Sequence, residues 1–260
     1  MGLDPGHRKG VSLPEPAVTA VVQARMNSTR LPGKVLRVLG DTTVLGHVVR
    51  RLLACSSLTR VVVATTREAA DDAVCREATS VGALVTRGSE DDVLGRFVQA
   101  LDEHGGDIGV RITSDCPFID PALIDRGVRR LRASDPPPDY LSNTLLRTYP
   151  RGYDFEVFLV EALRKAAREA RSAGEREHVT PFLYRHPERF RLESLERPDP
   201  LASAEWRVTL DTPEDWDVIR ALFDRLEPVN RVFGLDEVER LVAREPALLA
   251  ANRRVRQKPH

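Results

Sequence analysis

The sequence lacks a net charge, a long apolar run and a large share of aromatic residues. Its 39 Lys+Arg residues balance its 39 Asp+Glu residues, so no overall basic field is available for nucleic acid or an anionic membrane. Aromatic residues make up only 5% of the chain, and no aromatic-rich RNA-binding motif is present. No apolar stretch approaches the roughly 20 residues of a membrane span. We therefore expect neither nucleic-acid nor membrane partners.

Cysteines are also few. Cys55, Cys75 and Cys116 are odd in number and lack the Cys-x-x-Cys spacing, which argues against a disulfide framework and a zinc ribbon and favours a cytoplasmic location. Residues 1–16 lack the apolar stretch of a signal peptide and contain three prolines, so we expect a mobile leader. We expect one domain over residues 17–250 and a frayed basic tail over residues 251–260.

The first half of the sequence alternates β-branched runs with amphipathic segments. Buried strands are predicted at residues 18–23, 60–65, 83–86 and 108–113, and apolar residues recur at helical spacing over residues 44–53 and 93–101. This alternation predicts a mostly parallel α/β sheet with helices on both faces. Ligands of such sheets bind beyond the carboxyl ends of the strands, so functional residues are expected in the segments that follow them.

The second half has a looser pattern. The segment SDPPPD, residues 134–139, is expected to end a helix and begin an extended segment. Further strands are predicted at residues 153–158 and 190–195, with two helical segments between them. A last strand at residues 207–210 is expected to lead into a helix with Thr212 as its N-cap and Pro213 as its first residue.

The segment after the first strand, residues 23–34, brings three cations together. Arg25, Arg30 and Lys34 lie on one predicted loop beside small residues such as Ser28, a composition that suits a polyphosphate. The loop is not a Walker A motif, because no glycine lies five residues before Gly33. A solvated basic loop is the alternative that the residues alone leave open.

Two aspartates are candidate ligands for a hard cation. Asp115 lies just past the fourth predicted strand, where one or two carboxylates are enough for Mg²⁺. Asp211 precedes Thr-Pro-Glu-Asp, which by itself is more often a helix start than a metal site. Asp120, followed by Pro121, is expected to cap a helix.

Ordered motifs from Val18 to Leu226 resemble a known family. In chain order they are VVQARMNSTRLPGKVL, VVVATT, RGSEDDVLGRF, RITSDCPFIDPALID, SNTLLRTYPRGYDFEVF, EREHVTPFLY and RVTLDTPEDW. Together they resemble the spore coat polysaccharide biosynthesis protein F family, a branch of the cytidylyltransferases similar to CMP-Kdo and CMP-acylneuraminate synthetases. The sequence departs from the family at Asn27 and Ser114, where glycine is expected. Asparagine also tolerates unusual φ angles.

The resemblance implies a Rossmann-like fold of the nucleotide-diphospho-sugar transferase type, with an acceptor and dimerisation subregion over about residues 140–205. It implies that CTP and Mg²⁺ bind, that Arg25, Lys34 and Asp115 are catalytic, and that Asp115 and Asp211 hold the metal. The implied nucleotide-binding residues comprise the first loop, the base and ribose surroundings and the first carboxylate: Ala24, Arg25, Asn27, Ser28, Arg30, Lys34, Thr65, Ser89, Arg96 and Asp115.

The acceptor pocket is expected in the second half of the sequence. A sugar acid needs hydrogen-bonding partners and a cation for its carboxylate, and Asn, Asp, His and Arg residues there can supply them. The candidates are polar or aromatic residues of two segments: Asn143, Thr144, Tyr149, Arg151, Asp154, Glu156, Arg176, Glu177 and His178. Simple packing is the alternative for Tyr149, and a structural histidine is the alternative for His178.

The resemblance implies that a sugar hydroxyl attacks the α-phosphorus of CTP and that pyrophosphate leaves. It also implies a homodimer formed through residues 182–195. The alternatives are a glycosyltransferase that uses a nucleotide sugar, a nucleotidyltransferase with a non-sugar acceptor such as a phosphonate or an alditol phosphate, and a noncatalytic regulator. The presence together of Lys34, Asp115 and Asp211 speaks against the regulator.

Overall fold

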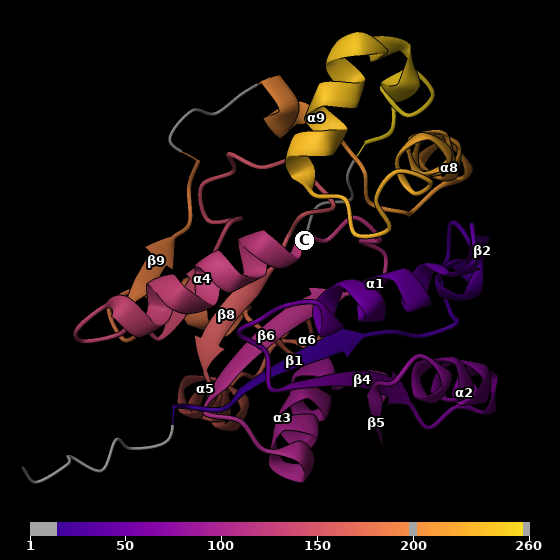
Figure 1. Cartoon of the computed structure of the whole chain (residues 1–260). Coiled ribbons are helices and arrows are strands. Elements are labelled where there is room, and N and C mark those ends of the chain that lie inside the picture. Colours follow the sequence, from indigo (N-terminus) through magenta and orange to yellow (C-terminus); the bar gives the residue numbers. More distant parts are fainter. Residues whose placement is uncertain (1–14, 198–201, 257–260) are drawn as a thin grey trace, which may run out of the picture.

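A seven-stranded sheet forms the centre of the protein (Figure 1). The computed structural model describes residues 15–197 and 202–256. The strands follow one another across the sheet in the order β5-β4-β1-β6-β8-β7-β9. Their bounds are β1 Val18–Gln23, β4 Arg60–Thr66, β5 Leu84–Gly88, β6 Ile108–Thr113, β7 Tyr140–Ser142, β8 Glu156–Leu159 and β9 Leu192–Ser194. A separate small ribbon pairs β2 (Val38–Leu39) with β3 (Thr42–Thr43).

The sheet has a parallel part and a mixed part. Strands β5, β4, β1 and β6 pair in parallel, whereas β8 runs antiparallel to both β6 and β7, and β9 is parallel to β7. The predicted mostly parallel α/β sheet is confirmed. The bounds of β1 and β6 match the prediction, because continuous β-branched runs are typical of strands covered on both faces. β4 is one residue longer than predicted, and β5 is shifted toward Gly88.

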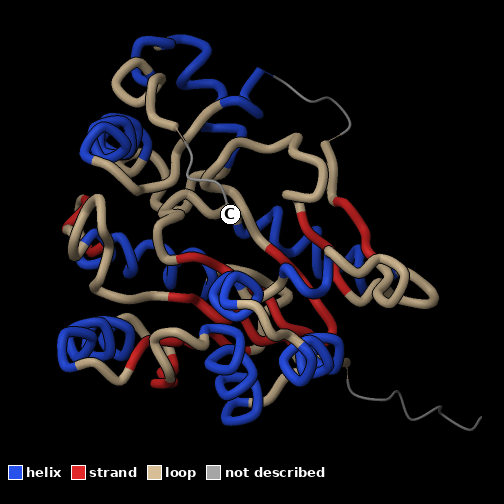
Figure 2. Tube along the Cα trace, turned by 180° about the vertical axis from the view of Figure 1, so that it is seen from behind, coloured by secondary structure: helices blue, strands red, loops and turns tan. Residues whose placement is uncertain are grey.

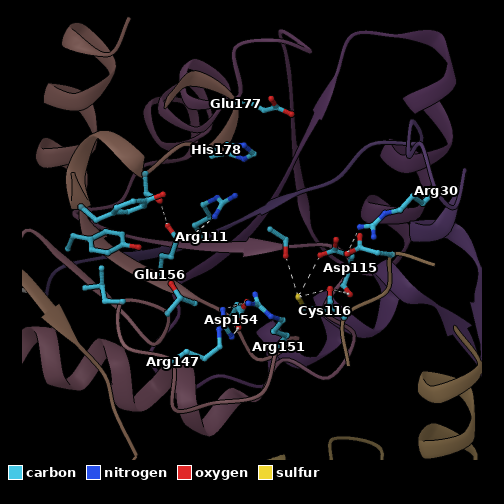
Figure 3. A pocket seen from close by; sticks show the side chains of 18 residues that line it. Arg30, Arg111, Asp115, Cys116, Arg147, Arg151, Asp154, Glu156, Glu177 and His178 are labelled. Carbon is cyan, nitrogen blue, oxygen red and sulfur yellow. Dashed lines mark hydrogen bonds and ion pairs between the residues drawn. The ribbon is translucent and has the colours of Figure 1, made fainter. Parts of the chain in front are cut away.

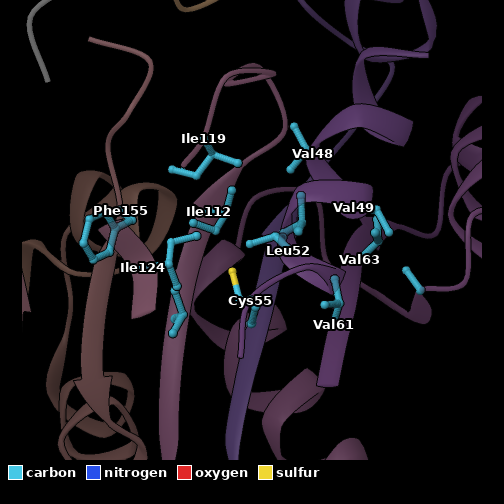
Figure 4. Close-up of a cluster of buried hydrophobic side chains, with 14 of the residues drawn as sticks. Val48, Val49, Leu52, Cys55, Val61, Val63, Ile112, Ile119, Ile124 and Phe155 are labelled. Atoms are coloured by element: carbon cyan, nitrogen blue, oxygen red, sulfur yellow. The ribbon is translucent and has the colours of Figure 1, made fainter. Parts of the chain in front are cut away.

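Helices cover both faces of the sheet (Figures 1 and 2). Along β1, Val18, Ala20 and Val22 enter one core cluster and Val21 enters another, as alternation along a strand requires. Figure 4 shows part of the first cluster. It includes residues of α1 (Val44–Leu53), α2 (Asp72–Ser80) and α4 (Pro121–Ala133). The opposite face packs against α3 (Val93–His104), α5 (Val160–Glu169) and α7 (Pro181–Tyr184), and α6 (Ala173–His178) contacts α3.

A third cluster is built on α8 (Pro213–Leu226) and α9 (Leu235–Arg244), which lie together at one end of the molecule (Figure 1). The predicted start of α8 is confirmed: Thr212 is the N-cap in a capping box, with Pro213 in the first turn. Asp120 likewise caps α4. Short 3-10 helices complete the described chain: η1 Lys34–Leu36, η2 Ala69–Asp71, η3 Ala202–Glu205 and η4 Pro246–Leu249.

Three predictions for the second half need correction. The strand expected at residues 153–158 is β8, over Glu156–Leu159, and the one expected at 190–195 is the shorter β9. The strand expected at 207–210 is wrong, because only Arg207 forms a bridge, with Arg151. The rest of that apolar segment is buried against the third cluster instead. The break at residues 134–139 is confirmed, since α4 ends at Ala133 and β7 begins at Tyr140.

The ends of the chain are partly docked. Residues 1–14 of the expected leader and 257–260 of the expected tail lie outside the described residues. Glu15 and Pro16 accept hydrogen bonds from Arg132. Asn252 is buried and donates to Arg207 O at 2.8 Å and Asp215 Oδ1 at 2.9 Å, so this part of the expected tail belongs to the folded unit. Over the described ranges, no helix combines the length and apolarity needed to cross a membrane.

The close approach of the Gly152 and Val208 backbones predicts the effect of a methyl group. Gly152 has a φ of +108°, and an added Cβ would lie 2.6 Å from the Val208 carbonyl carbon. We expect Gly152→Ala to lower the free energy of unfolding by about 1–3 kcal/mol, measured by urea denaturation. Gly174→Ala is the matched control, because nothing lies within 4 Å of its added Cβ. Equal stability of the two variants would contradict this account.

Candidate active site

The loop after β1 directs cations toward the carboxyl edge of the parallel strands. It closes on itself through a hydrogen bond from Gly33 N to Met26 O at 3.0 Å, and Met26 N donates to Asp71 Oδ1 at 2.7 Å. Gly33 has a φ of +68°, a conformation that glycine adopts without strain. The chain turns there and enters η1 at Lys34. The local fold therefore fixes the backbone of Lys34.

The Lys34 ammonium joins two segments that are distant in the sequence. Its Nζ lies 2.8 Å from Asp115 Oδ2, 2.7 Å from Asp211 Oδ1 and 2.7 Å from Leu210 O. The two segments are also joined directly, because Leu210 N donates to Asp115 O at 2.8 Å. Asp115 follows β6 and Asp211 precedes α8. The structure thus brings together the two predicted carboxylates and the predicted lysine.

Two arginines also hold Asp211. Arg30 Nη2 lies 3.0 Å from Asp211 Oδ2, and Arg207 Nη2 lies 2.6 Å from the same atom. Arg207 Nε also contacts Asp215 Oδ1, at 2.9 Å. Sequence reasoning did not find Arg207. Arg207 lies four residues before Asp211. That spacing indicates a contact within a helix, but these two residues do not lie in one.

Burial and charge act in opposite directions on the pKa values of this group. Burial favours the neutral form of Lys34, but Asp115 and Asp211 outweigh it and raise the lysine's pKa. Burial likewise opposes ionisation of both aspartates, yet Lys34 lowers the pKa of Asp115 and, together with Arg207 and Arg30, lowers that of Asp211 to about 2. All three groups are therefore charged at neutral pH.

The donor set at this point fits a divalent cation. In the described part of the chain, no group of three or more His, Cys, Asp or Glu side chains is arranged to hold a metal. Mg²⁺, however, keeps several waters and commonly takes one or two carboxylates together with substrate phosphates. Two carboxylate oxygens and one carbonyl oxygen converge here on a cationic group, the Lys34 ammonium. The residues present fit a magnesium ion bound with a phosphate.

The other residues implied for nucleotide binding lie around the ends of β1, β4 and β5. Arg25 and Asn27 both approach Glu90 Oε1, at 3.4 and 3.3 Å. The guanidinium of Arg96 is buried and donates through Nη1 to Ser89 O. Within the described chain its Nε and Nη2, and the buried Thr65 Oγ1, have no hydrogen-bond partner. Ala24 is buried where the loop leaves β1, and Ser28 is partly exposed on that loop.

A polar cavity of about 750 Å³ adjoins the Lys34 group (Figure 3). Arg30, Asp115 and Asp211 form one side of its lining. Most of the predicted acceptor residues line it too, namely Thr144, Arg151, Asp154, Glu156, Glu177 and His178.

Three predicted acceptor residues do not line the cavity. The Asn143 side chain is buried and bonds the backbone of Tyr153 and Phe155. Tyr149 is buried in the third core cluster, and its hydroxyl accepts from Arg126 at 3.1 Å. Arg176 forms an ion pair with Asp92 at 2.6 Å. These side chains shape the segments around the cavity, and direct acceptor contact by them stays a prediction.

Several lining residues were not predicted. They come from β6, β7 and the loops that follow them, from α7 and its N-cap, and from the segment before α8: Arg111, Thr113, Cys116, Tyr140, Leu145, Arg147, Thr180, Tyr184 and Thr209. Arg111 pairs with Glu156, its register partner on β8, and Thr180 Oγ1 donates to the other Glu156 oxygen. An arginine inside the otherwise apolar strand at residues 108–113 was a signal that could have found this network.

Arg151 differs from the other cavity arginines. Arg147 is paired with Asp154 through two contacts, at 2.8 and 3.1 Å, and Arg111 is paired with Glu156. Among the described residues, Arg151 has no ion-pair or hydrogen-bond partner for its guanidinium. Burial and the positive charges of Arg147 and Arg207 lower the pKa of Arg151. A bound anion would offset the repulsion among these three guanidinium groups.

A strained turn forms one wall of the cavity. Val179 has φ +73° and ψ −56°, and Thr180 N donates to His178 O at 2.9 Å, which together define a γ-turn that is rare for a β-branched residue. Thr180 precedes Pro181 with a ψ of −3°, also a disfavoured conformation. Val179 is fully buried, so packing holds the turn while His178 and Thr180 line the cavity.

This strain predicts an inverted order of stability at residue 179. Val179→Gly and Val179→Ala both lose buried side-chain atoms, but only glycine adopts a positive φ without cost. We expect Val179→Gly to be more stable than Val179→Ala by about 1 kcal/mol in urea unfolding. The matched pair is Val128→Gly and Val128→Ala in α4, which is also fully buried and where alanine should be the more stable by about 1 kcal/mol. The same order at both positions would contradict the strain.

A cationic loop, a carboxylate pair and an adjoining polar cavity at the carboxyl edge of the sheet define a phosphate-handling α/β transferase. A family model described as Cytidylyltransferase matches residues 19–251. The chain belongs to the cytidylyltransferase family and is a CTP-dependent nucleotidyltransferase.

Similar sequences and a similar solved structure are consistent with this family. The chain is 35% identical to the spore coat polysaccharide biosynthesis protein SpsF of Bacillus subtilis, over 79% of this chain and 85% of that protein. It is 36% identical to an uncharacterized protein of Methanocaldococcus jannaschii, over 94% and 97% of the two chains. A cytidylyltransferase structure from Leptospira borgpetersenii is 32% identical, with a TM-score of 0.86 over 94% of this chain and all of that one.

A more distant structure shows the fold alone. CMP:2-keto-3-deoxy-manno-octonic acid synthetase complexed with CTP has a TM-score of 0.62 and 19% identity, over 80% of this chain and 99% of that one. The fold is thus of the nucleotide-diphospho-sugar transferase type, as the sequence resemblance predicts.

Proposed function

We propose that this protein transfers CMP from CTP to a hydroxyl group of a sugar acid, with Mg²⁺ bound and with release of pyrophosphate. The observation that carries the proposal is the convergence of Asp115, Asp211 and Lys34 between the cationic loop and the polar cavity. SpsF takes its name from a spore coat polysaccharide, and a 3-deoxy-manno-octulosonate cytidylyltransferase of Solibacter usitatus is 37% identical over 49% of each chain. The first name supports a product used for polysaccharide synthesis, and the second supports a sugar acid as the acceptor.

The nucleotide lies along the carboxyl ends of β1, β4 and β5 in this proposal. Arg25, Arg30 and Lys34 hold the triphosphate, since each can turn from its present carboxylate partner to a phosphate oxygen. Arg96 and Thr65 face the base and ribose. Their buried polar atoms lack partners in the described chain, and leaving such atoms unsatisfied costs stability.

Asp115 and Asp211 would hold Mg²⁺, which supplies charge neutralisation at the phosphates when bound. The chain's own contribution is positioning. Arg30 and Arg207 fix Asp211, and the bond from Leu210 N to Asp115 O fixes the distance between the two segments. Attack by the acceptor hydroxyl at the α-phosphorus breaks the bond to the β-phosphate, and the loop cations stabilise the pyrophosphate that leaves.

The acceptor occupies the polar cavity. Arg151 offers an unpaired guanidinium for a carboxylate, and Thr144, Asp154, Glu156 and His178 are partners for sugar hydroxyl groups. A cavity lined mainly by hydrogen-bonding side chains suits a polyhydroxylated molecule. Because Arg151 has no partner for its guanidinium within the described chain, an acceptor that carries an anion fits better than a neutral sugar.

The protein is proposed to act in the cytoplasm as a homodimer. All three cysteines are free, which suits a reducing compartment. Dimerisation through residues 182–195 is supported by β9, which pairs with β7 on one side and ends the sheet on the other. Phe182 and Phe190 are already buried within the chain, so backbone pairing of β9 is the contact we propose.

Nucleotide selectivity tests the first half of the proposal. We expect CTP with Mg²⁺ to raise the melting temperature more than UTP, ATP or GTP, since a ligand at 100 times its Kd stabilises by about 2.7 kcal/mol. Asp115→Asn should lose the part of the CTP shift that depends on Mg²⁺. Asp224→Asn, an exposed carboxylate of α8, should keep it. An equal response to all four nucleotides would contradict the base assignment.

Acceptor recognition tests the second half. We expect sugar acids, but not the matching neutral sugars, to trigger pyrophosphate release from CTP. Arg151→Met should raise the KM for the acid at least about tenfold, the effect of losing roughly 1.4 kcal/mol of charged hydrogen bonding, with little change in the KM for CTP. Arg244→Met, at the end of α9, is the control. A nucleotide sugar consumed without pyrophosphate release would instead indicate a glycosyltransferase, and turnover of a phosphonate or an alditol phosphate a non-sugar acceptor.

A further inference from the structure

The Lys34 ammonium fills the point on which Asp115 and Asp211 converge. Its three contacts, to Asp115 Oδ2 at 2.8 Å, Asp211 Oδ1 at 2.7 Å and Leu210 O at 2.7 Å, satisfy the three protons of an ammonium group. The same oxygens are the donors that a hard divalent cation prefers. One position is therefore suited to two different cations, and in this structure the lysine holds it.

The charges around this position already balance. Lys34, Arg30 and Arg207 face Asp115, Asp211 and Asp215, and both oxygens of Asp211 have cationic partners. The Lys34, Asp115 and Asp211 side chains are only 12%, 23% and 15% exposed. A divalent ion that entered alone would add two positive charges to a poorly solvated, neutral group, and unpaired charge is costly there.

A triphosphate reverses this balance. It brings several negative charges to the loop, and the flexible four-carbon stem of lysine lets the ammonium turn toward them. Only the side chain has to turn. The backbone around it is held by hydrogen bonds from Lys34 N to Leu31 O at 3.2 Å and from Leu36 N to Gly33 O at 3.0 Å. Once the ammonium has turned, two carboxylates face each other without it, and their repulsion favours a metal ion.

We infer that Lys34 keeps free divalent cations out of the Asp115–Asp211 site until a bound triphosphate draws its ammonium away. This inference rests on the proposed function, which supplies the triphosphate and the metal. Its consequence is that nucleotide and metal bind as a coupled pair, and each raises the affinity for the other by the same factor.

The test measures Mn²⁺ binding by electron paramagnetic resonance, without any acceptor or turnover. Lys34→Met keeps the length of the side chain and removes its charge. We expect this variant, without nucleotide, to bind Mn²⁺ on the order of tenfold more tightly than the wild type. CTP should raise the Mn²⁺ affinity of the wild type on the order of tenfold and that of Lys34→Met far less. Lys165→Met is the control, since Lys165 lies over the Phe190 ring on α5.

Further variants keep the outcome decisive. Lys34→Arg retains the charge and should bind Mn²⁺ as weakly as the wild type. Lys34→Gln replaces Lys34→Met if circular dichroism shows that the methionine variant does not fold. Equal Mn²⁺ affinity of the wild type and the neutral variants, or no Mn²⁺ binding by the latter, overturns the inference. Pyrophosphate release by the wild type tests the proposed function separately. If the wild type releases pyrophosphate but Lys34 does not affect Mn²⁺ binding, the inference fails and the proposed function stands.

Discussion

The contact of one ammonium with two carboxylates is the constraint on which the rest of the site depends. Lys34, Asp115 and Asp211 come from three separate segments, and each is fixed by a local device: a glycine turn, the end of a buried strand and a helix cap. Moving any segment would leave a buried charge unpaired, which costs several kcal/mol. Electrostatics therefore joins the parallel half of the sheet to the helices α8 and α9, which pack mainly in a core cluster of their own.

The position of β6 explains why two binding regions can meet. This strand is parallel to β1 on one side and antiparallel to β8 on the other, so it belongs to both parts of the sheet. Its carboxyl end leads to Asp115, while Arg111 and Thr113 on the same strand line the polar cavity. The distance between the proposed nucleotide and acceptor sites is thus set by a few residues of rigid strand, which suits a reaction that requires both substrates to be held in register.

How well the sequence predicts a feature depends on how far apart in the sequence the interacting residues lie. The parallel strands and the caps at Asp120 and Thr212 were predicted well, because periodicity and capping are local. The carboxylates and Lys34 were found through position and resemblance. Arg111 and Thr180 were missed because their roles come from the antiparallel pairing of β6 with β8 and from the γ-turn. The arginine in an apolar strand marked Arg111 as unusual, but no local pattern identified Glu156 as its partner. Asn143 and Tyr149 are residue types that often bind ligands, yet both side chains are buried in the interior of the protein.

The docking of Asn252 has a consequence for how the protein matures. Its amide bonds Arg207 O and Asp215 Oδ1, and Arg207 in turn holds Asp211. A nascent chain builds its sheet from segments made early, since domains generally begin to fold from the N-terminal side during synthesis. The two hydrogen bonds of Asn252, in contrast, cannot form until residue 252 has left the ribosome. Products of premature termination shortly before that residue would contain the segments of the sheet and the cavity but lack the hydrogen bonds that support Arg207 and Asp215.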